Sequence, residues 1–162
     1  MRKQQKGFSL IELLIVVAII LIIAAIAIPN LLRSRMAANE ASAVGSLRTI
    51  DTAEMTFTTT YPDVGYANLA SLGGTATACA TATGATSTTA CLIDDVLATT
   101  AVKSGYSFTT VAGGGAPAVT YTSLAVPSVV GQSGQRAFCS DQSGVIRYNA
   151  TGTACSNADN PL

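Results

Sequence analysis

The chain has 162 residues, nearly half of them hydrophobic, with nine basic and nine acidic side chains and a formal net charge of zero. Histidine, the commonest general base and the usual zinc ligand, is absent. We find neither a nucleophile paired with a base nor a phosphate-binding glycine loop, and the basic residues beyond the first seven are scattered. We therefore predict that the chain is not an enzyme, needs no cofactor and has no specific nucleic-acid partner.

The first element is an apolar run from Phe8 to Ile28, preceded by three basic residues within positions 1–7. As an α-helix it would extend about 31 Å, enough to cross the hydrocarbon core of a bilayer, which is about 30 Å thick. One acid, Glu12, interrupts the run. A carboxylate in lipid costs about 2.5 kcal/mol or more, so we predict a membrane-spanning segment whose single acid needs a partner.

The small residue Gly7 stands directly before the apolar run. A secretory signal peptide would instead carry its small-residue cleavage motif after the run, and no such motif follows Ile28. Cleavage between Gly7 and Phe8 would keep the apolar segment and create an α-amino cation about one helical turn from Glu12. That new amino terminus is a candidate partner for the acid.

The run from Lys6 to Leu14, Lys-Gly-Phe-Ser-Leu-Ile-Glu-Leu-Leu, continues to Pro29 and resembles the type IV prepilin amino terminus. Type IV pilins and the pseudopilins of type II secretion share this segment. The resemblance implies that a membrane peptidase cuts after Gly7 and methylates the new amino terminus at Phe8. It also implies that Glu12 meets the amino terminus of a neighbouring subunit during filament assembly. The alternative is an ordinary single-span membrane anchor in which Glu12 has no functional role.

After the membrane half (8–28), the helical pattern continues as an amphipathic half over 29–59. Its apolar positions recur at helical spacing, and most of the charged residues fall elsewhere. The apolar stripe comprises Met36, Ala43, Leu47, Ile50 and Phe57, and the charged residues are Arg33, Arg35, Glu40, Arg48, Asp51 and Glu54. Pro29 lacks an amide hydrogen and is expected to kink or loosen the helix. A helix this long cannot be buried by its own small domain. The apolar surface of its first half must therefore be covered by lipid or by the same helix of other subunits.

The composition changes at Tyr61, and we predict an αβ loop over 60–102 with a short helix over 92–98. Its Thr/Ala-rich part, 75–90, has too little side-chain bulk to form a core and is expected to be exposed. We interpret the paired acids Asp94 and Asp95 as lying on the solvent-exposed face of this short helix and not as a metal site.

Alternating residues predict antiparallel β structure over 103–162. One hairpin joins 106–109 to 119–126 through three glycines, and a second pairs 137–139 with 145–148. We expect an α+β fold of the type IV pilin kind, with about four strands packed on the amphipathic half of the helix. Asp141 and Ser143 are weak candidates for a calcium site, since a plain turn explains them better.

Four cysteines lie beyond the membrane segment at wide spacings, which favours disulfides over metal binding. Three connectivities are possible. We favour Cys79 with Cys91 and Cys139 with Cys155, because each pair brackets a polar loop. Disulfides indicate an oxidising, extracytoplasmic location.

The preferred hypothesis is a structural subunit with residues 1–7 as leader. It would sit in the bacterial inner membrane as a single-pass precursor and then form an extracellular filament. Its partners would be copies of itself, the prepilin peptidase and methylase, the inner-membrane pilus assembly machinery and the lipid bilayer. The alternatives are a pseudopilin of type II secretion and a membrane-anchored binding module that does not polymerise.

Overall fold

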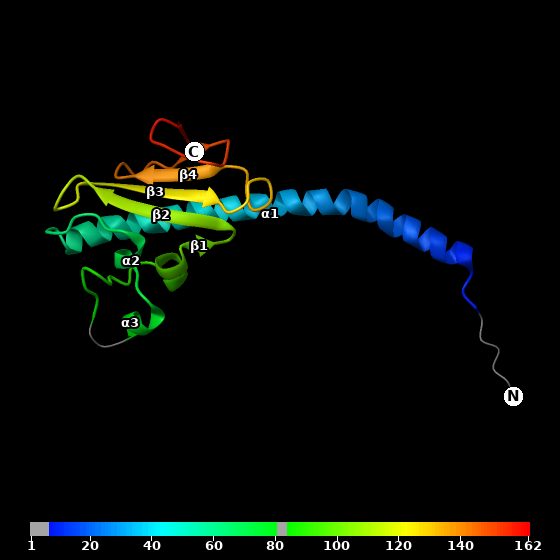
Figure 1. The fold of residues 1–162 in the computed structure, drawn as a ribbon, viewed down its shortest axis with the longest axis horizontal. Coiled ribbons are helices and arrows are strands. Elements are labelled where there is room, and N and C mark those ends of the chain that lie inside the picture. Colours follow the sequence, from blue (N-terminus) through cyan, green and yellow to red (C-terminus); the bar gives the residue numbers. More distant parts are fainter. Residues whose placement is uncertain (1–6, 81–83) are drawn as a thin grey trace. The chain divides into compact units, whose positions relative to one another are not determined.

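The computed structural model describes residues 7–80 and 84–162 and divides into two compact units, Met1–Arg35 and Met36–Leu162. We call the second unit the head. Helix α1, Leu10–Thr60, begins in the first unit and ends in the head (Figure 1). It starts two residues later and ends one residue later than the predicted 8–59 helix. Pro29 lies inside α1, and the predicted kink there stays a prediction.

The head contains one antiparallel sheet in which six strands follow one another in chain order. The strands are β1 Val102–Lys103, β2 Tyr106–Gly113, β3 Thr120–Pro127, β4 Ala137–Asp141, β5 Arg147–Asn149 and β6 Asn160–Pro161. The predicted α+β fold is confirmed, and both predicted hairpins are present. The two extra strands are the edge strands β1 and β6, each of two residues, which is too short to produce a visible alternation in the sequence.

The core of the head lies between one face of this sheet and the second half of α1 (Figure 1). Alternate residues of β2 and β3 point toward α1, as the period of two in a strand requires. The helix contributes residues spaced three and four apart, so they fall on one side of it. The main buried side chains are Ala43, Leu47, Ile50 and Phe57 from α1 with Tyr106, Phe108, Ala125 and Phe138 from the sheet.

A second, smaller cluster comprises buried Ala137, Cys139 and Cys155, with Leu124 and Val126 packed against them. The disulfide between Cys139 and Cys155 ties the C-terminal segment to β4. The other disulfide joins Cys79 to Cys91 and closes the Thr/Ala-rich loop. Both pairs are those favoured from the sequence.

The region between α1 and β1 has more structure than predicted. It contains the short helices α2 (Leu69–Leu72) and α3 (Ala76–Ala80), and residues 81–83 of the predicted loop lie outside the described residues. The helix predicted over 92–98 is wrong in position and type, since the structure has a single π-helical turn, η1, over Val96–Thr100. Asp94 explains the late start, because its side chain accepts a hydrogen bond from the Leu97 backbone N–H.

Candidate functional site

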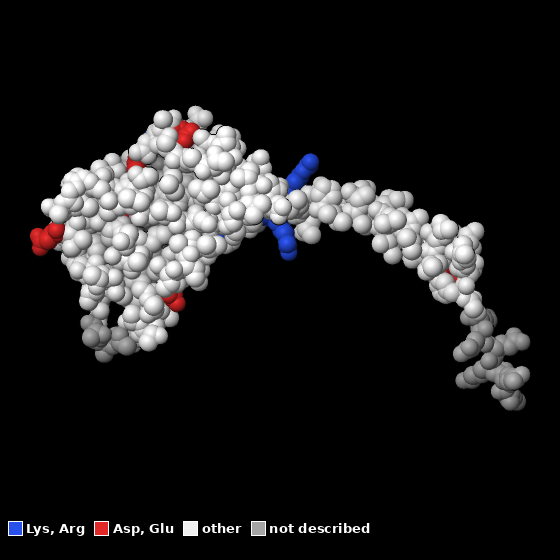
Figure 2. Space-filling view, viewed as in Figure 1, with Lys and Arg blue, Asp and Glu red and all other residues white. Residues whose placement is uncertain are grey.

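The first functional feature is the apolar segment of α1, whose side chains have no cover within the first unit. Leu10, Leu21 and Ile28 are 78%, 63% and 66% exposed, and the segment between them is exposed in the same way. This segment contains no Lys or Arg, and in Figure 2 no blue atoms appear along it. Among the described residues, α1 is the helix long and apolar enough to cross a membrane. Each large apolar side chain gains about 1.5–3 kcal/mol when buried, so the segment strongly favours lipid or a protein partner.

Glu12 lies in the first turn of α1 and is exposed on this apolar surface. A carboxylate in the first turn interacts favourably with the partial positive charge of a helix N-terminus. Within the part of the chain that the structure describes, Glu12 has no hydrogen-bond or ion-pair partner. Its charge is therefore available to a group from another molecule.

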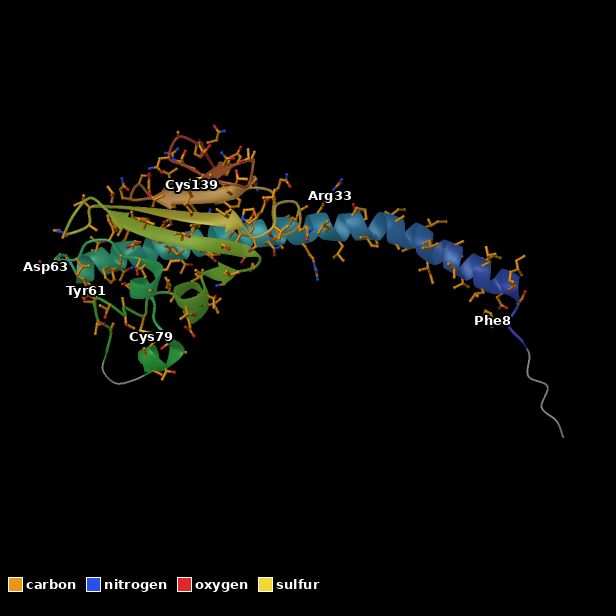
Figure 3. All side chains as sticks on the ribbon, viewed as in Figure 1. Phe8, Arg33, Tyr61, Asp63, Cys79 and Cys139 are labelled. Carbon is orange, nitrogen blue, oxygen red and sulfur yellow. A yellow bond between two sulfur atoms is a disulfide. The ribbon has the colours of Figure 1, made fainter. Side chains whose placement is uncertain are left out.

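Gly7 and Phe8 precede α1 and have no regular secondary structure. Phe8 is 74% exposed, and Figure 3 shows its side chain at the end of the described chain. A Cβ added at Gly7 would meet no atom within 4 Å. Exposed, non-helical backbone of this kind is the preferred substrate of peptidases.

In the head, three acidic side chains of α1 hold the helix to other elements. The first, Glu40, accepts hydrogen bonds from the backbone N–H groups of Gln135 (2.9 Å) and Arg136 (3.1 Å). It also pairs with the Arg136 guanidinium at 2.8 Å. Burial alone would raise the pKa of Glu40, but these donors outweigh it and lower the pKa below its ordinary value. The Arg136 guanidinium stacks in turn over the rings of Phe138 and Tyr148.

The second acid, Asp51, connects α1 to the centre of the sheet. Its Oδ1 accepts hydrogen bonds from the hydroxyls of Tyr121 on β3 (2.9 Å) and Ser140 on β4 (2.5 Å). Burial and the nearby Asp141 raise the pKa of Asp51, although both hydroxyls favour its charged form.

The third acid, Glu54, is fully buried. Its Oε2 accepts a hydrogen bond from the Ala67 backbone N–H at 3.0 Å, and its Oε1 has no partner among the described residues. Burial, together with the charge of Asp51, raises the pKa of Glu54 to about 7.

The prediction that the charged residues of α1 lie away from its apolar stripe is therefore wrong for Glu40 and Glu54. The spacing contained the missing signal. Positions 40, 43, 47, 50, 54 and 57 alternate by three and four residues, which places both acids on the buried side. The partners of these acids could not be read from the sequence, because Gln135 and Arg136 lie 95 and 96 residues from Glu40.

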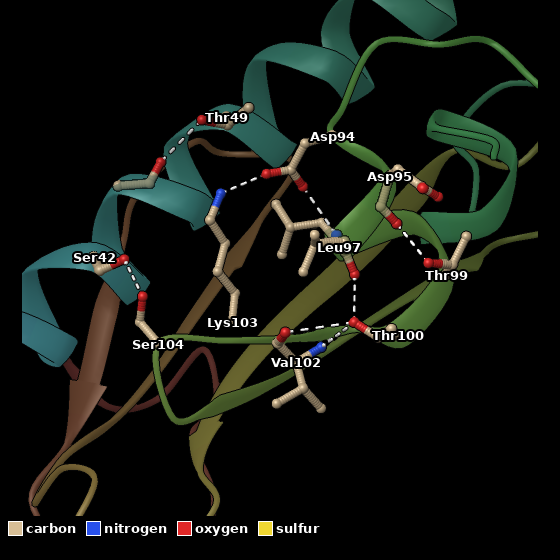
Figure 4. Close-up of polar contacts among 12 residues, drawn as sticks. Ser42, Thr49, Asp94, Asp95, Leu97, Thr99, Thr100, Val102, Lys103 and Ser104 are labelled. Atoms are coloured by element: carbon tan, nitrogen blue, oxygen red, sulfur yellow. Dashed lines mark hydrogen bonds and ion pairs between the residues drawn. The ribbon is translucent and has the colours of Figure 1, made fainter. Parts of the chain in front are cut away.

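Two of the remaining candidate acids, Asp94 and Asp141, have local structural partners. Asp94 forms an ion pair with Lys103 beside η1, as Figure 4 shows. Asp141 accepts hydrogen bonds from the backbone N–H and the hydroxyl of Ser143, which is the geometry of a turn. Among the described residues no group of three or more potential metal-ligating side chains comes together.

Comparisons with known proteins agree with the N-terminal features. The family described as "Prokaryotic N-terminal methylation motif" matches residues 2–28. The type IV wide pilus major component PilA4 of Thermus thermophilus is 63% identical over 38 residues, covering 24% of this chain and 29% of that protein. The type IV major pilin protein PilA of Myxococcus xanthus is 46% identical over 54 residues, covering 33% of this chain and 24% of that protein. No solved structure matches the chain.

The similarity thus spans less than a third of the length of either relative. The family match covers residues 2–28, and the disulfide-containing sheet of the head lies beyond it. The matched motif and the two relatives show that part of this chain is similar to type IV pilins, and its fold joins a long N-terminal helix to an antiparallel sheet.

Proposed function

We propose that this chain is the structural subunit of a type IV pilus-like filament. The observation that carries the proposal is the apolar segment of α1, which is exposed on all sides and contains one acid without a partner among the described residues. Identical apolar helices that pack together bury such surfaces against one another once they leave the bilayer. The two relatives named above, both described as major pilus components, support the same function.

The proposed sequence of events begins in the bacterial inner membrane, where residues 8–28 span the bilayer and residues 1–7 form the leader. A prepilin peptidase hydrolyses the peptide bond after Gly7, and a methylase modifies the amine of Phe8. The assembly machinery then extracts the subunit into the filament. There, Glu12 pairs with the amino terminus of a neighbouring subunit, so that a charge disfavoured in an apolar setting gains a counter-ion.

Mass spectrometry of the N-terminal peptide from sheared extracellular material tests this proposal. We expect a peptide that begins at Phe8 and carries the mass of one added methyl group. Electron microscopy of the same material should show long fibres. Short, cell-bound filaments would instead indicate a pseudopilin, and a monomer that still carries Met1 would indicate an anchored binding module.

A further inference from the structure

Arg33 and Arg35 follow the apolar segment of α1, and the fold uses neither of them. Both side chains are exposed. In residues 7–80 and 84–162, neither guanidinium takes part in a hydrogen bond or an ion pair. The next acid along the chain, Glu40, is already paired with Arg136. The charges of both arginines are therefore available to an anion from another molecule.

The apolar surface of α1 continues directly up to this pair. Leu31 and Leu32 are exposed, like the residues of the apolar segment before them. From residue 13 to residue 39, Arg33 and Arg35 are the only charged residues in the sequence. The pair therefore marks the place where a surface suited to lipid ends and a charged one begins.

The axial position of the pair matches the headgroup layer of a bilayer. At about 1.5 Å per residue, Arg33 and Arg35 lie about 7.5 Å and about 10.5 Å beyond Ile28 along α1. The headgroup layer extends about 5–7 Å beyond the hydrocarbon core on each side. An arginine side chain is long enough to bend back toward this layer, as it does at the ends of membrane helices. With residues 8–28 in the hydrocarbon core, both guanidiniums therefore reach the lipid phosphates.

The two side chains project in nearly opposite directions. Residues two apart on an α-helix are separated by about 200° around its axis. Figure 2 shows basic side chains on both sides of α1 just beyond the apolar segment, and Figure 3 labels Arg33 among them. One small anion cannot contact both guanidiniums in this arrangement, whereas separate lipid molecules around the helix can. The directions of the pair therefore favour a lipid surface over a free phosphate ion.

We propose that Arg33 and Arg35 bind the phosphate groups of anionic phospholipids on the side of the bilayer opposite the leader, and so fix the depth of the apolar segment. The N–H groups of a guanidinium match a phosphate in a bidentate geometry. The inference rests on the bilayer-spanning precursor of the proposed function. Residues 1–7 carry three basic residues for the other side of the bilayer. Cleavage after Gly7 removes them, so the two arginines then hold the subunit at its depth.

The first test is a titration of the full chain with short-chain phosphatidylglycerol in uncharged maltoside micelles, followed by NMR of the backbone amides of residues 30–36. We expect saturable shifts, and an apparent Kd that rises about 30-fold in Arg33→Gln/Arg35→Gln, since each arginine near an anionic surface contributes about fivefold. Glutamine is a good helix former, so α1 stays helical in this variant. Lipid bound at the leader shifts the signals of residues 1–7 instead, so the two effects are read separately.

Two controls accompany this titration. Arg48→Gln changes an arginine of the head that is also exposed and has no ion-pair partner among the described residues, so it should bind the lipid like the unmodified chain. Inorganic phosphate at the same concentration should leave the amides of residues 30–36 unchanged. An unchanged Kd in the double variant would refute the proposal, and so would equal shifts with inorganic phosphate, which would indicate a site for a free anion.

The second test measures depth in bilayer nanodiscs that contain phosphatidylglycerol and a lipid with a gadolinium chelate on its headgroup. On the head side of the apolar segment, amide broadening should be greatest at residues 33–35. A maximum at residues 24–28 or beyond residue 40 would refute the contact with the headgroups. A water-soluble gadolinium chelate separates this inference from the proposed function. If it broadens residues 10–28, the chain does not span the bilayer and the proposed function fails. If these residues are shielded but residues 30–36 do not respond to phosphatidylglycerol, only this inference is wrong.

Discussion

The contact between Glu40 and the 135–136 backbone yields a quantitative prediction for the stability of the head. Glu40→Ala removes the acceptor for two backbone N–H groups and the partner of the Arg136 guanidinium. Losing the acceptor of two part-buried N–H donors costs about 1–3 kcal/mol for each donor, while the Arg136 side chain is 39% exposed and regains hydration. We therefore expect a loss of about 3 kcal/mol for Glu40→Ala. Glu40→Gln keeps a carbonyl acceptor for both N–H groups and should cost about 1 kcal/mol.

The assay is denaturant unfolding of the full chain in detergent, monitored by tyrosine fluorescence. The chain lacks tryptophan, so no tryptophan emission hides the tyrosine signal. The denaturant concentration at the unfolding midpoint should be lowest for Glu40→Ala, higher for Glu40→Gln and highest for the unmodified chain. The slope of the free energy of unfolding against denaturant concentration should be the same for all three. The pKa of Glu40 is lowered in the folded head, so its stabilising effect is present above its ordinary pKa of about 4.5 and disappears as the pH falls below it. Equal midpoints for Ala and Gln would show that the carbonyl acceptor contributes nothing, contrary to our reasoning.

Two further predictions concern assembly and the disulfides. Glu12→Gln, and equally Glu12→Ala, should leave cleavage and methylation intact but abolish filaments, because no counter-ion remains for the neighbouring amine; normal filament yield in electron microscopy would exclude this role. Opening either disulfide by a double Cys→Ser change should cost about 3 kcal/mol through the chain entropy of loops of 12 and 16 residues. Loss of Cys139–Cys155 should cost more than loss of Cys79–Cys91, because Cys139 is fully buried, and equal unfolding midpoints would contradict that ranking.

Much of the fold followed from patterns that act over short distances in the chain. The apolar run after Gly7 predicted the helix, and the alternation around residues 106–126 predicted the central hairpin. The prediction that charged residues lie on the exposed side of α1 was wrong for Glu40 and Glu54. It relied on their being charged and not on their spacing along the helix. Each acid lies at a buried position of the three-and-four pattern, where backbone N–H groups from distant segments complete its environment.

The region between α1 and the sheet was harder to predict, for physical reasons. Its helices α2 and α3 have four and five residues, too few for a periodic pattern. They are placed by contacts that the sequence does not reveal, such as the Asn68 cap and the disulfide at Cys79. The turn η1 begins at Val96 because the Asp94 side chain bonds the Leu97 N–H.

The polar contacts of α1 within the head also have a mechanical consequence. Glu40, Asp51 and Glu54 fasten the helix at three levels, separated by about 16 Å and about 4.5 Å along its axis. A tensile force along the axis would load these contacts together in shear, along with the apolar side chains between them. The sheet and loops of the head therefore resist sliding along α1 as a unit, because the three contacts share the load.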